Sequence, residues 1–284
     1  MKKIFPLFLA LTVLTGCSEE TEPTPGLAPV GGVISLRSES LLKNEPAAKA
    51  ATHSETAAGQ RLTYTFEAWT KDANPRCALH KTANGTFDEA AIEIALVPGT
   101  YDFLFWADYG TGAYTTADLR QIKIAMTSGS TPATYAPGSE RDAFACVLPD
   151  VQWNGGNGVS ATLKRPLAKL TMRNKEAFNT GDKAVSVTYR NVPTRYDVLT
   201  EKTSGPQTVT VAFPNTTVNS ATVGEDFLFV PSNAGQSVGL SITVGDVTKG
   251  IDVLQLQRNY ATSVTATFEE ATGTVSYTHL TLPT

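Results

Sequence analysis

Apolar and polar residues alternate with a period of two along most of the chain. In the stretch that begins at Leu62, the side chains of Leu62, Tyr64 and Phe66 fall on one face and those of Thr63 and Thr65 on the other. This alternation is typical of a β-strand with one buried face. Helical periodicity is nearly absent, so the pattern predicts an all-β fold. The predicted strands cover residues 33–38, 62–69, 92–96, 101–109, 141–148, 161–173, 185–191, 208–213, 226–230, 238–244 and 253–268.

One predicted strand is rich in aromatic residues. It follows the turn signal Pro98-Gly99 and places Tyr101, Phe103 and Phe105 on one face. So many aromatic side chains in a single strand predict the centre of a core.

Breaks in the alternation divide the chain. Residues 127–140 are polar and contain two prolines, which predicts a long loop. The Gly- and Asn-rich segment 154–158 is the clearest break and predicts a domain boundary. We therefore expect two β-sandwiches in series, at residues 32–157 and 158–273.

The N-terminal residues predict export and lipid attachment. Lys2 and Lys3 precede a short apolar run, which is typical of a signal peptide over residues 1–16. Leu14-Thr15-Gly16-Cys17 resembles the lipobox of bacterial lipoproteins, so we expect the Cys17 thiol to carry the lipid. Residues 17–31 then form an acidic, Pro-rich tether. Its first residues, Ser18 to Glu22, resemble the acidic signal that sends lipoproteins of some gut anaerobes to the outer face of the outer membrane, while a solvated linker explains them equally well.

The last residues predict an artefact. Residues 274–284 resemble one translated reading frame of a common sequencing adapter. We therefore expect the natural protein to continue differently after about residue 273, which resequencing of the gene's 3′ end would test.

Charge and cysteine content narrow the function classes. The 284 residues carry a net charge of −4 with no basic stripe, which argues against nucleic acid as a partner. Besides Cys17, only Cys77 and Cys146 are present. In an oxidising compartment these two can form a disulfide or remain thiols, and the sequence leaves both open.

Catalytic chemistry is not indicated by the sequence. Only His53, His80 and His279 are present, and His279 lies in the suspected adapter. We therefore predict no catalytic residues, no metal site and no cofactor, and a protein that is not an enzyme.

Three segments resemble the fimbrillin family, the pilins and pilus-associated lipoproteins of type V pili. They are Pro98 to Asp108, Leu163 to Leu170 and Leu256 to Tyr260. The resemblance implies two transthyretin-like sandwiches and a surface lipoprotein of the outer membrane with an adhesion role. Its partners would be other pilin subunits or accessory lipoproteins, and a host or glycan ligand is compatible with this role.

The resemblance also implies assembly by strand donation. In the shaft pilins of the family, a protease cuts after a basic residue near the first strand, that strand leaves, and a neighbour's strand fills the groove. Here the removable strand would be residues 33–38, and the cleavage positions to consider are Arg37, Lys49 and Arg61. We favour cleavage in the polar segment 47–60, which contains Lys49 and is followed directly by Arg61.

The alternative function is a surface glycan-binding lipoprotein. It would need Trp69, Trp106 and Trp153 on one exposed platform, because sugars stack on flat aromatic faces. Burial of Trp69 and Trp106 between sheets is the simpler expectation.

Overall fold

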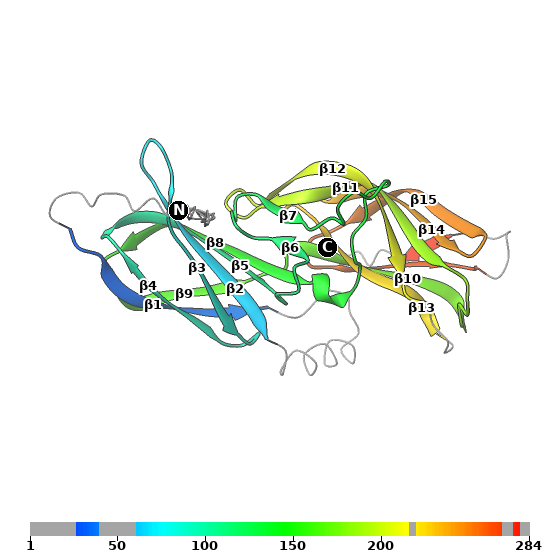
Figure 1. Cartoon of the computed structure of the whole chain (residues 1–284), viewed down its shortest axis with the longest axis horizontal. Helices are drawn as coiled ribbons and strands as arrows, with labels where there is room; N and C mark the ends of the chain where they lie inside the picture. Colours follow the sequence, from blue (N-terminus) through cyan, green and yellow to red (C-terminus); the bar gives the residue numbers. More distant parts are fainter. Residues whose placement is uncertain (1–26, 40–60, 216–219, 269–274, 279–284) are drawn as a thin grey trace, which may run out of the picture.

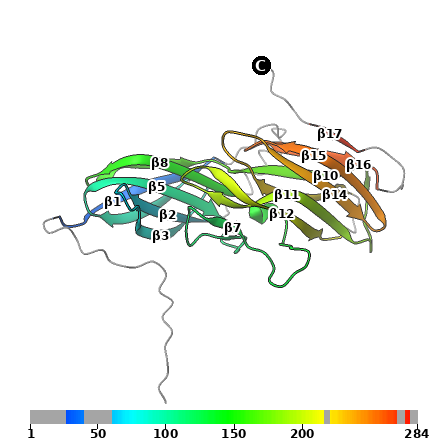
Figure 2. The same ribbon diagram turned by 90° about the horizontal axis from the view of Figure 1, so that it is seen from above.

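The computed structural model describes residues 27–39, 61–215, 220–268 and 275–278. They form two β-sandwiches placed end to end in an elongated molecule (Figure 1, Figure 2). No α-helix occurs in these ranges, and none of their helices is long and apolar enough to cross a membrane. The predicted all-β class with β-sandwich domains is confirmed.

The first sandwich has two sheets. Its strands are β1 (Val30–Ser38), β2 (Leu62–Thr70), β3 (Cys77–Gly85), β4 (Ala90–Leu96), β5 (Gly99–Asp108), β8 (Ala143–Trp153) and β9 (Gly156–Leu163). One sheet has the order β4-β1-β9 and the other the order β3-β2-β5-β8. Alternate side chains of both sheets meet in one buried aromatic core, as the period-two pattern predicts.

The second sandwich also has two sheets. Its strands are β6 (Tyr114–Thr115), β7 (Ile122–Ile124), β10 (Leu167–Phe178), β11 (Val185–Asp197), β12 (Lys202–Phe213), β13 (Ser220–Phe229), β14 (Gln236–Val244), β15 (Val247–Leu256), β16 (Ala261–Ala266) and β17 (Ser276–Thr278). One sheet has the order β13-β10-β16-β17. The other has the order β15-β14-β11-β7-β6, and β12 also pairs with β11.

The connection between β5 and β8 crosses from the first sandwich to the second. Its strands β6 and β7 lie beside the second sandwich in Figure 1, where Ile122 of β7 pairs with Tyr196 of β11. Further along, Ala133 pairs with Val209 of β12, and a single 3-10 turn at Ser139–Arg141 leads back to β8. We call residues 109–142 the crossing segment.

Strand β5 is buried on both faces. Phe103 and Phe105 belong to the core of the first sandwich, whereas Leu104 and Trp106 belong to the core of the second. The first sandwich therefore presents the outer face of this sheet to the second sandwich, and the two cores are separated by one layer of backbone.

The main chain passes between the sandwiches at Arg165 and Pro166. The boundary expected between residues 157 and 158 lies inside β9, which pairs with β1 of the first sandwich. Strand β10 pairs with strands of the second sandwich only. Pro166 separates the two strands, because proline has no backbone N–H to continue a ladder. We propose Arg165 as the boundary instead.

Strand β17 lies inside segment 274–284. It pairs with β16, where Val264 faces Tyr277. The adapter origin of this segment stays a prediction.

Candidate functional site

Strand β1 fills a groove in the first sandwich. It is the middle strand of its sheet, antiparallel to β4 and parallel to β9. Ile34 and Leu36 point inward and are 0% and 3% exposed. A strand that is paired on both edges and buried on one face leaves open backbone groups and an apolar groove when it is removed.

The turn between β8 and β9 closes one end of this groove. The Trp153 indole donates a hydrogen bond to the Val30 carbonyl oxygen at 3.2 Å. Gly155 and Gly156 both have positive φ, at 85° and 94°, so the turn needs glycine. A Cβ at Gly32 would overlap the Gly156 carbonyl and lie 2.5 Å from the Trp153 ring. The backbone of β1 is therefore packed directly against this turn.

A polar contact marks the other end of the groove. The Ser38 hydroxyl lies 3.1 Å from the Tyr64 hydroxyl, and Tyr64 donates to the Thr86 carbonyl oxygen at 2.6 Å. Burial raises the pKa of Tyr64, so its proton stays in place at neutral pH. Because Tyr64 has only that proton, Ser38 is the donor in their contact.

The predicted processing residues lie in different surroundings. Arg37 is inside β1, where its backbone pairs with Thr162 of β9 and its guanidinium donates to the Thr162 hydroxyl at 2.9 Å. Arg61 is exposed and precedes β2. Lys49 and Cys17 lie outside the described residues. Proteases need an extended, accessible backbone, so the geometry favours Arg61 over Arg37.

Cys77 and Cys146 are not joined in a disulfide. They lie on β3 and β8, the two edge strands of one sheet, with β2 and β5 between them. Three strand spacings separate them by roughly 14 Å, whereas a disulfide needs Cα atoms within about 7 Å. This sheet order is incompatible with the bonded alternative.

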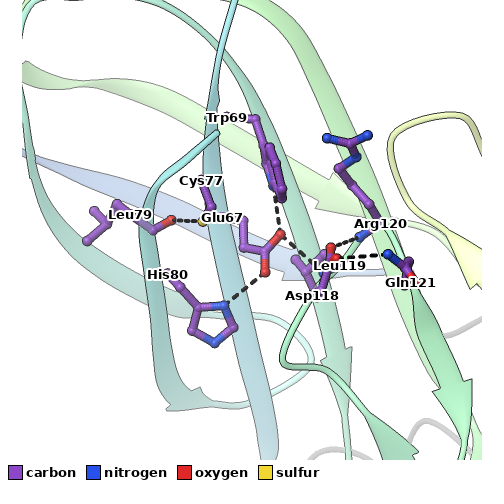
Figure 3. A network of polar contacts seen from close by, with 9 residues as sticks. All are labelled: Glu67, Trp69, Cys77, Leu79, His80, Asp118, Leu119, Arg120 and Gln121. Atoms are coloured by element: carbon purple, nitrogen blue, oxygen red, sulfur yellow. Dashed lines mark hydrogen bonds and ion pairs between the residues drawn. The ribbon is translucent and has the colours of Figure 1, made fainter. Parts of the chain in front are cut away.

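A buried carboxylate joins the first sandwich to the crossing segment (Figure 3). Glu67 of β2 is 1% exposed. Its oxygens accept from the Trp69 indole at 2.8 Å and from the backbone N–H of Leu119 at 3.1 Å, and the His80 ring nitrogen Nδ1 lies 2.9 Å away. We call Glu67, Trp69, His80 and Leu119 the Glu67 contact. Since Leu119 lies in the core of the second sandwich, this contact ties the two sandwiches together.

The tryptophans do not form the platform that the glycan-binding alternative requires. Trp106 and Trp153 are 0% and 2% exposed and lie in different cores. Trp69 is half-buried, and the Arg120 guanidinium lies over its ring at 4.4 Å from the centroid. A sugar therefore finds no shared aromatic face on these three residues.

A buried ion pair lies inside the second sandwich. Arg141 donates to Asp226 at 3.1 Å, and the Tyr135 hydroxyl donates to the same carboxylate at 2.8 Å. Burial raises the pKa of Asp226, and the Arg141 charge opposes this shift. Asp226 is 0% exposed, so this cluster is out of a substrate's reach and acts in stability. Among the residues that the structure describes, no three His, Cys, Asp or Glu side chains gather as a metal site.

Comparison with known families decides where the chain belongs. A model described as a family of unknown function, DUF6562, matches residues 33–278. The chain belongs to the DUF6562 family. Residues 1–18 match the prokaryotic membrane lipoprotein lipid attachment site, which includes the predicted Cys17. The DUF6562 match includes the first five residues of the segment predicted to come from an adapter.

Solved structures resemble this DUF6562 chain at low identity. A Bacteroides thetaiotaomicron protein, provisionally described as polysaccharide-binding (DUF1812), is 10% identical with a TM-score of 0.53, over 84% of this chain and 91% of that chain. The tip fimbrial protein Mfa3 from Porphyromonas gingivalis, solved with a C-terminal truncation, is 10% identical with a TM-score of 0.48, over 88% and 98%. No curated protein sequence matches. At these identities the likeness concerns the fold alone.

The residues at the two ends of the groove were not predicted from the sequence. Gly32 and Trp153 are far apart in the sequence of this DUF6562 chain, as are Ser38 and Tyr64, and only the placement of β1 between its neighbours brings each pair together. The Gly-rich segment 154–158 was visible as a signal but was interpreted as a domain boundary. A turn that contacts β1 produces the same composition.

Proposed function

We propose that this protein is a lipid-anchored subunit of a fimbrial or adhesive assembly at the cell surface, and that it joins neighbouring subunits by exchanging β1 for their strand. The observation that carries the proposal is the position of β1. It is the middle strand of its sheet and packs into the aromatic core. In sequence it lies between the lipid attachment site and a polar segment bounded by basic residues.

The physical argument concerns the vacated groove. Without β1, the facing edges of β4 and β9 lose their backbone partners, and the aromatic core is exposed to water. A donated strand restores the hydrogen bonds while its alternate side chains refill the core. The outer membrane and the outer cell surface are the proposed location, with other subunits or accessory lipoproteins as partners.

Assembly is tested by controlled cleavage. The chain with Cys17→Ala is purified and treated with a trypsin-like protease, and the products are run on a denaturing gel without heating. We expect heat-resistant ladders, because strand-exchanged subunits separate slowly. Arg61→Gln tests whether cleavage at that position is needed. Cleaved protein that remains monomeric would contradict strand exchange.

The anchor is tested separately. Palmitate labelling of cells should be lost in Cys17→Ala and retained in Cys77→Ala. Equal labelling of both variants would contradict attachment at Cys17.

Glycan binding is the second candidate function, and electrophoresis in a gel that contains polysaccharide tests it. Retardation of the protein in a polysaccharide gel without ladder formation would favour it. The burial of Trp106 and Trp153 removes the platform on which that alternative depended.

A further inference from the structure

The groove around β1 differs along its length in the space and the polarity that it offers to side chains. These differences define which strand fits it. Besides Val30, which is partly buried against the core where β1 begins, four side-chain positions of β1 face the groove with a spacing of two, at Gly32, Ile34, Leu36 and Ser38. Because side chains alternate across a strand, these four positions are the ones that any occupant must match.

The Gly32 position admits no side chain. A Cβ there would meet the Gly156 carbonyl and the Trp153 ring. The Gly156 atom belongs to the backbone, so it cannot rotate away as the end of a flexible side chain would. The Trp153 indole donates to the Val30 carbonyl oxygen of β1 itself, so a backbone carbonyl of any occupant must take this place to keep the bond.

The two middle positions are apolar. Ile34 and Leu36 lie in the core with Phe66 of β2 and Phe103 of β5. Phe66 and Phe103 pack edge to face with their centroids 5.0 Å apart, which fixes the floor of the groove. An occupant gains from branched apolar side chains at both positions.

The Ser38 position is small and polar. Ser38 is 8% exposed, and its hydroxyl donates to Tyr64, whose own proton is already used by Thr86. An occupant without a hydroxyl donor there would leave one buried acceptor of Tyr64 without its partner.

The direction of the occupant is also fixed. β1 runs parallel to β9 and antiparallel to β4, and the glycine position lies at its N-terminal end. A strand in the reverse direction would bring its last residue against Trp153 and its first against Tyr64. Only a strand with the polarity of β1 places glycine and hydroxyl at their own ends.

We propose that the groove accepts a strand of a neighbouring subunit that runs in the direction of β1 and carries glycine, two apolar residues and then serine or threonine at alternate positions. This inference rests on the proposed strand exchange and names the partner of that site. The occupant is a peptide strand, because the groove offers two strand edges and already holds one.

The test is a peptide exchange on the full chain. A Cys17→Ala variant with a specific protease site inserted after Lys49 is cleaved, so that β1 is held without a covalent link to the body. Fluorescent peptides with the sequence Val30–Ser38 are added, and their binding is followed by anisotropy. The peptides carry the unchanged sequence, G32A, S38A or S35A, and one has the reversed sequence. Ser35 is exposed, so S35A is the matched control.

We expect the unchanged and S35A peptides to bind equally. G32A should bind at least tenfold more weakly, S38A about threefold to tenfold more weakly, and the reversed peptide should not bind. Equal binding of the unchanged, G32A and S38A peptides would overturn the proposed requirement for glycine and serine or threonine. It would not contradict strand exchange. Failure of every peptide, with β1 retained after cleavage, would overturn strand exchange and this inference with it.

Discussion

Arg165 lies where the main chain passes from one sandwich to the other. Its guanidinium bonds both oxygens of Asp142, at 2.6 and 2.7 Å, and donates to the Asn259 side chain at 2.8 Å. Arg258 donates to the Arg165 carbonyl oxygen at 3.1 Å. Two of the segments that resemble fimbrillins therefore meet at this point, because one contains Arg165 and the other contains Arg258 and Asn259.

Loss of this guanidinium should be costly. Arg165→Met leaves Asp142, which is 1% exposed, as a buried charge without its cation, so we expect the free energy of unfolding to fall by about 3–5 kcal/mol. Urea denaturation measures this change. Arg195→Met is the matched control, since Arg195 is exposed on β11 and should matter by less than about 0.5 kcal/mol. Equal effects of the two variants would contradict a stabilising role for the contact between Arg165 and Asp142.

Asp108 should give stability a specific pH dependence. Burial raises its pKa above 3.8, while the Trp106 indole and the Gly110 N–H donate to the carboxylate and oppose the shift. The folded protein thus holds this proton more tightly than the unfolded chain does. The resulting stability is present below pH 3.8 and is lost as the pH rises through the folded pKa.

Asp108→Asn removes this titration. The stability of the unchanged protein relative to Asp108→Asn should therefore decrease as the pH rises from 3.8 through the folded pKa, as urea denaturation at several pH values would show. A difference that stays constant or grows with pH would contradict a raised pKa.

Sequence patterns predicted buried residues better than their contacts. The alternation correctly placed Tyr64, Phe66 and Phe103 in a core. The partners of Glu67, Arg165 and Ser38 were not predictable, because each contact joins residues distant in the sequence and depends on how the strands pair.

At the scale of elements, most strands were predicted. Two of the predicted strands, however, each span two separate strands of the structure. The apolar alternation of residues 161–173 continues through Pro166, where the chain changes sandwich between β9 and β10. Residues 253–268 likewise contain the turn at Asn259, which has a φ of 62°. Alternation alone does not report such turns, since side chains on both sides of them are buried.

Strands β3, β6 and β7 were missed for other reasons. β3 is an edge strand whose side chains are mostly exposed, so it carries little apolar alternation. β6 and β7 have two and three residues, and they are strands only through their pairing with each other and with β11, which is distant in the sequence. Pairing with a distant partner is not visible in a short local pattern.

The Glu67 contact predicts how the crossing segment is held. Glu67→Met keeps much of the size of the side chain but removes both acceptor oxygens, so the N–H groups of Leu119 and Trp69 lose their shared acceptor. We expect a loss of about 1–3 kcal/mol and faster hydrogen exchange at the Leu119 amide. Glu93→Met on β4 is the control, because Glu93 is exposed. Unchanged exchange at Leu119 would contradict this role.

At the scale of the whole molecule, the two sandwiches should unfold together. Trp106 of the first sandwich packs against Tyr196 and Phe229 of the second, with ring centroids 6.3 Å away in both cases. A residue that completes a neighbouring core makes each sandwich depend on the other.

Calorimetry tests this dependence. We expect one transition for the unchanged chain, and Trp106→Ala should lower the free energy of unfolding by about 3–5 kcal/mol. Val253→Ala, at a side chain that is 58% exposed, is the control. Two separate transitions in the unchanged chain, of which Trp106→Ala shifts only one, would contradict the coupling.

The double burial of β5 also determines how stiffly the two sandwiches are joined. A flexible linker between two domains would let the outer one swing, and its height would vary with thermal motion. Here Leu104 and Trp106 pack one sheet of the first sandwich against the core of the second. The crossing segment is a further covalent connection between the two sandwiches, in addition to the passage at Arg165 and Pro166. A tensile force on the two ends of the molecule would thus be shared among many packed side chains, and the two halves would behave as one stiff rod.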